Sequence, residues 1–561
     1  MRTFLRRLGL SLLVLASLLP LAALAQATNA FSGALQQLLA APERPFLHAG
    51  DSPQALNTLR ALYVRHGFAP LWQRAGTPTA QALRLVQALR DAEAYGLRPA
   101  DYDAALIDAQ IHELIAAREL STTRWAELDL RLSSAALRFV THLHYGRVDP
   151  RACGFRLPAP RVDLDAAAAV DRLATAGDTD AAITAVEPPF HHYQLLKAAL
   201  TTYRRLAADR NLAPLPAFVG RSVKPGGHYV GAAALRRLLV ALGDISADAA
   251  APASGPELDD TLDSALVAGL ASFQARHGLA ADGVLGKRTF AALTVPLARR
   301  VRQIELTLER WRWLPAFDSP PIVVNVPQFR LFAFQTGEDR ESDVLRMDVI
   351  VGQAFPHTRT PVFLADMKYV IFRPYWDVPQ SIVRRELMPE IRGNPGYLER
   401  NHMELVRGEA DDSPVVPATP ENVEALAAGG LRLRQLPGDD NALGAIKFVF
   451  PNPYNVFLHG TPAQHLFKEA RRAYSHGCIR VSDPVALAQY VLRNAPGDWS
   501  RENIELAMSG EPNQRVTLSK PIRVMVLYGT VIAAESGRVL FFDDIYGHDR
   551  KLERLLEAEH R

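Results

Sequence analysis

The chain has 561 residues, of which 48% are hydrophobic and 22% are charged. A chain of this length exceeds what one hydrophobic core supports, so several domains are expected, and the composition excludes a disordered or fibrous protein. The formal net charge of +3 gives no electrostatic case for binding nucleic acid. With only two cysteines, Cys153 and Cys478, a disulfide framework is also excluded.

The first 25 residues have the layout of a secretory signal. Arg2, Arg6 and Arg7 precede an apolar run from Leu8 to Leu24, which ends in small residues suited to cleavage. We therefore expect residues 1–25 to be a signal peptide and the mature chain, formally neutral without these three arginines, to be exported. An uncleaved membrane anchor is the alternative, because the apolar run is only slightly shorter than a spanning helix.

Residues 26–224 are predicted to form a helical scaffold domain. Apolar residues recur three and four positions apart, as helices packed on a common core require. One of these predicted helices stops at Gly146, with Pro150 just beyond it. Cys153 lies in a short turn after this helix and is interpreted as a small structural thiol.

Residues 225–296 are predicted to form a small unit of three short helices. Its segment FQARHGLAADGVLGKRTFAAL is similar to the peptidoglycan-binding module of bacterial wall enzymes. Every glycine in the segment also has an explanation as a turn former, so the motif identifies a fold better than it identifies a ligand.

A connecting helix is predicted over residues 297–317, after which the apolar period changes from helical to alternating. Residues 318–513 are therefore assigned to a mostly β domain, with strands expected at Ile322–Val326, Leu331–Phe334, Met347–Val351, Tyr369–Phe372, Lys447–Phe450 and Val456–Leu458. The Pro-rich, partly helical insertion at residues 375–443 is long enough to be a functional lid. Residues 514–561, with strands at Val524–Tyr528 and Val539–Phe542, are expected to complete the sheet, giving a multidomain α+β fold.

The reactive side chains of the chain concentrate in HGTPAQHLFKEARRAYSHGCIRV, which starts at His459. A thiol becomes a useful nucleophile when a base or a positive charge stabilises its thiolate, and His459, His476 and Arg480 are candidates to act on Cys478. Gly477, directly before the cysteine, allows close backbone approach, so that nearby amides can donate to an oxyanion.

A zinc site built from His459, His476 and Cys478 is the competing hypothesis, since imidazole and thiolate suit zinc. The motif lacks a fourth ligand, and two of the three candidates flank a single glycine. We therefore predict neither a metal nor another cofactor.

The same segment is similar to the active-site signature of L,D-transpeptidases. That signature is a His followed after roughly fifteen residues by Ser or Thr, then His-Gly-Cys, an apolar residue and Asn or Arg. Here residues 460–474 separate His459 from Ser475, His476, Gly477, Cys478, Ile479 and Arg480. The upstream RQLPGDDNALGAIKFVFPNPYNVFLHGT resembles the larger, lid-bearing branch of the family, which combines a helical scaffold, a wall-binding module and the catalytic domain.

Two positions depart from the family pattern. Arg480 stands where smaller members commonly have asparagine, and Gly460 stands where larger members frequently have an acidic residue. Neither departure removes a catalytic atom, but the group that orients His459 stays unassigned.

The resemblance implies a periplasmic enzyme that forms a thioester on Cys478 from a tetrapeptide stem, releases D-alanine and makes a 3→3 peptidoglycan crosslink. It implies His459 as general base, while His476 and backbone amides near Gly477 position the thiol and the oxyanion. The residues expected to contact substrate are Ser475, Arg480, Tyr375 and Trp376.

Expected partners are peptidoglycan stem peptides and glycan, and other wall-synthesis enzymes. The inner membrane joins them only if the signal is uncleaved. Two alternative functions stay open at this point. An L,D-carboxypeptidase would resolve the same thioester with water, and a non-catalytic scaffold would only bind the wall.

Overall fold

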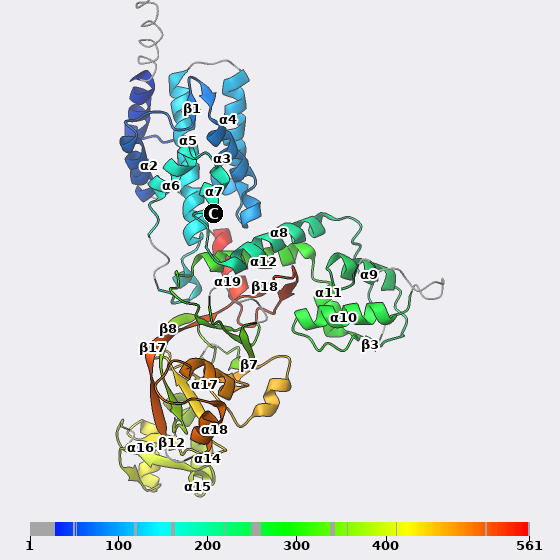
Figure 1. The fold of residues 1–561 in the computed structure, drawn as a ribbon, viewed down its shortest axis with the longest axis vertical. Coiled ribbons are helices and arrows are strands. Elements are labelled where there is room, and N and C mark those ends of the chain that lie inside the picture. Colours follow the sequence, from blue (N-terminus) through cyan, green and yellow to red (C-terminus); the bar gives the residue numbers. More distant parts are fainter. Residues whose placement is uncertain are drawn as a thin grey trace, which may run out of the picture.

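The computed structural model describes residues 29–558 except 49–50, 52, 117–120, 159–162, 219, 247, 249–259, 337–342, 356, 411 and 511–512. The expected signal segment lies outside these ranges. Within them, no helix combines the length and the apolar character needed to cross a membrane. Figure 1 shows the scaffold helices at one end of the molecule, the lid at the opposite end, and α8 and α12 between the scaffold and the catalytic sheet.

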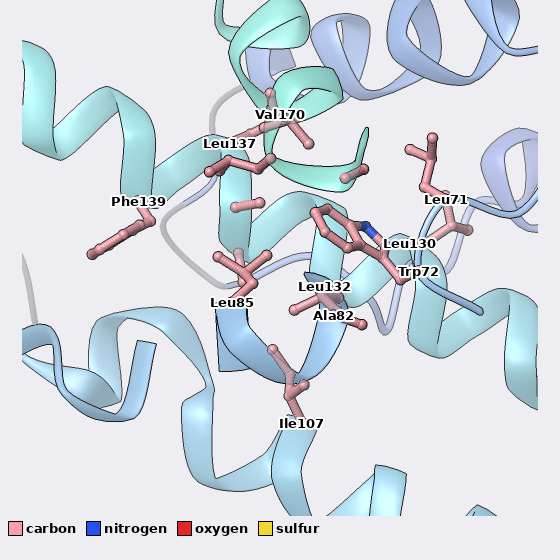
Figure 2. Packing of buried hydrophobic residues seen from close by; sticks show 14 of the residues in the cluster. Leu71, Trp72, Ala82, Leu85, Ile107, Leu130, Leu132, Leu137, Phe139 and Val170 are labelled. Atoms are coloured by element: carbon pink, nitrogen blue, oxygen red, sulfur yellow. The ribbon is translucent and has the colours of Figure 1, made fainter. Parts of the chain in front are cut away.

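The scaffold is helical, as predicted, and its apolar residues face one core (Figure 2). The long helix α5 (Thr122–Tyr145) runs through this core, where its buried Asp129 accepts hydrogen bonds from the amides of Leu71 and Trp72 at 3.1 and 2.9 Å. After the helical residues 29–40, the remaining elements are α2 (Pro53–Arg65), β1 (Gln73–Arg74), β2 (Thr77–Pro78), α3 (Ala80–Arg90), η1 (Ala92–Tyr95), η2 (Pro99–Tyr102), α4 (Ala104–Ala116), η3 (Pro150–Cys153), α6 (Ala166–Thr175), α7 (Thr179–Thr184) and α8 (His191–Ala208).

Helix α12 (Leu297–Arg312), the predicted connector, carries buried charges that tie the domains together. The Glu309 carboxylate accepts hydrogen bonds from the backbone amides of Arg147 and Val148 and from the fully buried Arg312, the last at 3.0 Å. Arg312 also donates to the carbonyl of Tyr95 and, at 3.1 Å, to the hydroxyl of Tyr193. Since these partners belong to three separate scaffold segments, Glu309 and Arg312 fix the scaffold to the connector.

The peptidoglycan-binding-like unit consists of β3 (Ser222–Val223), α9 (Ala232–Ala241), α10 (Ser264–Arg276), β4 (Leu285–Gly286) and α11 (Lys287–Leu293). Its motif residues hold the fold together. The buried Gln274 side chain donates to Asp282 at 2.8 Å and to Thr289 at 3.0 Å, and accepts from the amide of Gly283 at 2.8 Å. Gly283 has φ +66°, a conformation that favours glycine.

The catalytic domain is built on a nine-stranded sheet in the order β15-β7-β16-β14-β13-β8-β17-β5-β6, and a further ladder between β6 and β7 makes the sheet curve back on itself. Alternate residues of its strands form a buried core, as the period of two predicts. Its elements are β5 (Ile322–Asn325), β6 (Arg330–Ala333), β7 (Leu345–Gly352), β8 (Phe363–Phe372), β13 (Ile446–Val449), β14 (Leu458–His459), η7 (Gln464–Lys468), β15 (Ala473–Ser475), β16 (Ile479–Val481), α17 (Pro484–Leu492), α18 (Arg501–Ser509) and β17 (Gln514–Leu527).

The insertion forms a small subdomain with its own apolar core and a four-stranded sheet in the order β11-β10-β12-β9. The sequence showed helical and Pro-rich character here and did not reveal these strands, because each is only two to four residues long. The elements are β9 (Trp376–Asp377), α13 (Gln380–Ile382), the π-helical turn η6 (Val383–Leu387), α14 (Met388–Gly393), α15 (Tyr397–Arg400), β10 (Met403–Val406), β11 (Val415–Val416), α16 (Pro420–Ala428) and β12 (Arg432–Gln435).

The C-terminal segment differs in part from the expectation. Strand β17 does join the catalytic sheet, between β8 and β5. The segment expected as a final strand of that sheet, Val539–Phe542, instead contributes β19 (Val539–Phe541) to a separate hairpin with β18 (Val531–Ala533). This hairpin packs on α8 and α12, and a helix that was not predicted, α19 (His548–Ala558), packs on α12.

We predict that Glu309→Gln destabilises the protein by about 3–5 kcal/mol, because it leaves the buried Arg312 guanidinium without its carboxylate. Urea unfolding followed by tryptophan fluorescence measures the change. The matched control is Glu113→Gln, which removes an exposed scaffold ion pair with Arg124 and should cost at most about 1 kcal/mol. Equal effects of the two substitutions would contradict the assignment of Glu309 as a buried anchor.

Candidate active site

The sheet register brings His459 and Cys478 to one face. Strand β14 pairs in parallel with β16, so that Leu458 lies opposite Ile479 and His459 lies opposite Arg480. Leu458 and Ile479 point into the buried core. Side chains alternate between the faces of a sheet, so His459 and Arg480 lie on the other face. Cys478 lies two positions before Arg480, so the same alternation places it on the face of Arg480 and His459. It is therefore the diagonal neighbour of His459.

The tautomer of His459 follows from its hydrogen bond. His459 is only 4% exposed, and its Nδ1 lies 2.6 Å from the carbonyl oxygen of Gly460. Because a carbonyl can only accept, Nδ1 carries the proton, and the lone pair of Nε2 is left for another partner. The orienting groups that the sequence left unassigned are therefore in the backbone: the carbonyl of Gly460, one residue after the histidine, and Leu443, which also hydrogen-bonds the imidazole.

Two cations flank this histidine across the sheet. Lys447 of β13 and Arg480 of β16 are its direct neighbours in register. Burial, then repulsion from Arg480 and from Lys447, lowers the pKa of His459 to about 3. Burial raises the pKa of the Cys478 thiol, while a hydrogen bond from the Phe457 amide and attraction to the same two cations oppose that rise. At neutral pH the site therefore holds a neutral imidazole and a thiol rather than an ion pair.

Lys447 was missed by the sequence reasoning. It is a charged residue inside the apolar run AIKFVF, and its Nζ lies 3.9 Å from the centroid of the Phe457 ring. A lysine within an otherwise apolar strand was the available signal, but only the strand pairing shows that it lies beside His459.

The turn that carries the thiol is held by Ser475. The Ser475 hydroxyl is 2% exposed, donates to the carbonyl of Cys478 at 2.5 Å and accepts from the amide of Gly477 at 3.1 Å. Gly477 has φ +119°, which favours glycine. In this arrangement the Gly477 amide is engaged by Ser475 rather than directed at an oxyanion, so Gly477 contributes the shape of the turn. The predicted contact of Ser475 with substrate stays a prediction.

A second chain of hydrogen bonds braces this turn from behind. The Thr360 hydroxyl donates to the Gly477 carbonyl at 2.9 Å and accepts from the Gly352 amide at 2.8 Å. The Tyr546 hydroxyl donates to the Gly352 carbonyl at 2.6 Å. A Cβ atom at Gly352 would lie 1.9 Å from the Thr358 carbonyl oxygen, so only glycine fits there. These bracing residues come from distant segments and carry no motif of their own.

The thiol and His476 have different partners. The Cys478 sulfur donates to the carbonyl of Asn455 at a sulfur–oxygen distance of 3.6 Å. The Nε2 atom of His476 lies 2.7 Å from Oε1 of Glu386, which belongs to the π-helical turn η6 of the lid. The structure thus directs the His476 imidazole toward the lid, and its expected role in positioning the thiol stays a prediction.

The other expected substrate contacts are divided between the catalytic sheet and the lid. Arg480 is half-buried, and its Nε has no hydrogen-bond partner among the described residues. The Tyr375 ring lies under the Arg434 guanidinium, at 4.4 Å from the ring centroid. Trp376 packs against the apolar core of the lid.

The second cysteine is placed differently. Cys153 is buried in the catalytic-domain core, where desolvation raises the pKa of its thiol to about 11. Within the described ranges, no three His, Cys, Asp or Glu side chains are grouped as metal ligands.

Comparison with known proteins adds three family matches. Residues 57–200 match a family described as "Scaffold domain", residues 232–293 match "Putative peptidoglycan binding domain", and residues 320–504 match "L,D-transpeptidase catalytic domain". One curated relative from Haemophilus influenzae, named "Putative L,D-transpeptidase", is 29% identical over 284 residues. That alignment covers 49% of this chain and 55% of the relative, so the chain matches about half the length of that protein.

We predict that the rate of Cys478 alkylation by iodoacetamide rises with pH in a single transition. Its midpoint should lie above the ordinary range for a thiol, because the raised pKa of Cys478 delays formation of the thiolate. Alkylation rates at each pH, followed by peptide mapping to separate Cys478 from Cys153, test this. Lys447→Met should move the transition to still higher pH, since it removes one stabilising cation. A fast plateau already present at pH 5–6 would instead indicate a thiolate–imidazolium pair and contradict the neutral site.

Proposed function

We propose that this chain, whose residues 320–504 belong to the L,D-transpeptidase catalytic-domain family, crosslinks peptidoglycan through an acyl-enzyme on Cys478. The observation that carries the proposal is the hydrogen bond from His459 Nδ1 to the Gly460 carbonyl, which fixes the imidazole on the sheet face to which the strand alternation also assigns Cys478. A base held in this tautomer next to a thiol is the arrangement that nucleophilic catalysis needs.

In the first half-reaction, the Cys478 sulfur attacks the carbonyl carbon of the third residue in a tetrapeptide stem. His459 takes the thiol proton and gives it to the departing amine of D-alanine as the peptide bond breaks. A thioester between Cys478 and the tripeptide results. Lys447 and Arg480 attract the thiolate, and they also stabilise the negative charge that develops on the oxygen of the tetrahedral intermediate.

In the second half-reaction, an amine from another stem attacks the thioester carbonyl and expels the Cys478 sulfur. His459 takes a proton from the attacking amine and returns it to the sulfur, which restores the starting state. When the acceptor is the side-chain amine of the third residue of its own stem, the product is a 3→3 crosslink. His459 begins each half-reaction as a neutral base, as its low pKa requires.

Arg480 is our candidate for binding the donor stem. Its Nε is a buried donor without a partner among the described residues, and an unsatisfied buried donor is costly. The terminal carboxylate of the tetrapeptide is an acceptor of matching charge that would complete its hydrogen bonding.

The lid supports transfer over hydrolysis. A thioester that must wait for an amine has to be shielded from water, and the lid reaches the catalytic motif through Glu386 and His476. The signal-like segment at residues 1–25 supports a periplasmic location, where the peptidoglycan substrate lies.

We predict that Glu386→Gln raises the ratio of hydrolysis to crosslinking by up to about fivefold, because the exposed Glu386–His476 contact contributes up to about 1 kcal/mol to lid closure. Mass spectrometry of the tripeptide and dimer products measures the ratio. Glu390→Gln, an exposed glutamate one turn along the lid, is the matched control and should leave it unchanged. The same increase in both variants would rule out a specific role for the Glu386–His476 contact.

The function itself is tested with purified disaccharide-tetrapeptide as both donor and acceptor. We expect a crosslinked dimer and free D-alanine from the wild-type protein. Cys478→Ala should form neither product while still binding purified sacculi. Exclusive formation of tripeptide would support the L,D-carboxypeptidase alternative, and sacculus binding without turnover by the wild type would support the non-catalytic scaffold.

A further inference from the structure

A cavity of about 1040 Å³ lies where four parts of the chain meet, away from Cys478 and His459. Its walls come from the start of α8, the turn after α10 of the peptidoglycan-binding-like module, the β18–β19 hairpin, and the outer face of the catalytic sheet. This volume is at the upper end of the range for ligand pockets, about 300–1,000 Å³, and such pockets favour domain junctions.

The floor of the cavity is an apolar face of the sheet. Val323, Phe332 and Met525 lie side by side on β5, β6 and β17, where the register pairs Val323 with each of the other two. Their sequence neighbours point into the buried core, so these three side chains point outward. Phe190 and Trp311 also line the cavity, with ring centroids 5.4 Å apart and ring planes inclined at 61°. Aromatic and aliphatic side chains of this kind offer apolar contacts to the faces of sugar rings.

The module contributes the turn after α10 and Arg288 to the cavity. Gln274, Gly283 and Thr289 stabilise the module internally, whereas His277–Leu279 and Arg288 line the cavity. This wall is held in place because the buried Arg276 side chain donates to the Val539 carbonyl at 2.9 Å and pairs with Asp244 at 2.6 Å. The His277 ring stacks on Phe273 at a centroid distance of 3.8 Å.

The rim of the cavity is mainly cationic. Five arginines line it, against three carboxylates. The arginines are Arg288, Arg330, Arg346, Arg471 and Arg472, and the carboxylates are Asp318, Glu535 and Asp543. Arg330 and Arg472 share Asp348, at 3.1 and 2.7 Å, and Glu535 lies 3.9 Å from His191. Arg288 and Arg471 are exposed at the cavity, and guanidinium groups suit a ligand that carries carboxylates.

Strand β7 gives the separation between the cavity and the catalytic turn. Arg346, near its start, lines the cavity, and Gly352, at its end, holds Thr360 against Gly477. Arg471 and Arg472 bring the lining nearer to this turn, because the Arg472 carbonyl accepts a hydrogen bond from the amide of Val351, next to Gly352. From Arg346 to Gly352, six residue steps of a strand span on the order of 20 Å. A four-residue stem spans at most about 14 Å when extended, so a stem that reacts at Cys478 does not reach the far end of the cavity.

We propose that the cavity is a second peptidoglycan subsite, which binds a glycan-and-stem segment remote from the reacting stem. Sugar faces lie on the apolar and aromatic walls, and the stem carboxylates pair with the rim arginines. The identity of the ligand rests on the proposed function. The consequence is that this enzyme holds the polymer at the cavity while a neighbouring stem reacts at Cys478.

Charge reversal at the rim tests the subsite. We expect the double variant Arg288→Glu and Arg471→Glu to bind purified sacculi about tenfold or more weakly than the wild type. Its turnover of the soluble disaccharide-tetrapeptide, which is too short to fill both sites, should be unchanged. Arg237→Glu, on an exposed position of the same module that does not line the cavity, is the control and should bind as the wild type does. Wild-type affinity in the double variant would overturn the proposal.

A second measurement needs no change at the cavity. Hydrogen–deuterium exchange of the Cys478→Ala protein, with and without soluble glycan-peptide oligomers, should show protection at residues 276–279 and 330–334. Protection confined to the lid and to residues 459–469 and 473–480 would overturn the subsite even if the double variant lost soluble turnover through misfolding. Absence of soluble turnover by the wild type would instead count against the proposed function alone.

Discussion

The buried carboxylate of Glu309 is the interaction on which the arrangement of the domains depends. A charge without water must be surrounded by donors, and Glu309 obtains them from the amides that follow α5 and from the buried Arg312. Arg310, between them, pairs with Asp549 of α19 at 2.6 Å. One helix therefore fixes the scaffold and the C-terminal helix together. The same helix supplies Trp311 to the interdomain cavity, so the position of that cavity also follows from this anchor.

The catalytic turn also contains buried ionisable groups, but these groups are uncharged. Here burial and two cations lower the pKa of His459, and burial raises the pKa of the Cys478 thiol, so the histidine stays neutral and the thiol stays protonated in the resting state. In the mechanism that we propose, reactivity is generated only when proton transfer to His459 accompanies attack by Cys478. The lid, which contacts the motif through Glu386, adds a route by which closure and chemistry are linked. A thiol that is protonated at rest is also less susceptible to oxidation.

Local patterns in the sequence were sufficient to predict the helical scaffold, the module motif and the strands from Ile322 to Phe372. The spacing of His459 and Cys478 was sufficient to place both in one site, because the motif itself contains both strands that pair. Lys447, Glu386 and Tyr546 were not predictable, since each reaches the site through strand pairing or packing with residues far along the chain. The hairpin at Val539–Phe541 was misassigned because a short apolar strand does not specify its partner.

The central claim is that Cys478 carries the acyl group and that His459 delivers and removes the protons. Rapid mixing with disaccharide-tetrapeptide, followed by intact-mass measurement and peptide mapping, tests it most directly. We predict an adduct of the disaccharide-tripeptide on Cys478, formed with loss of D-alanine and formed far more slowly in His459→Gln. An adduct on another residue, or crosslinked product without any adduct at Cys478, would contradict the account.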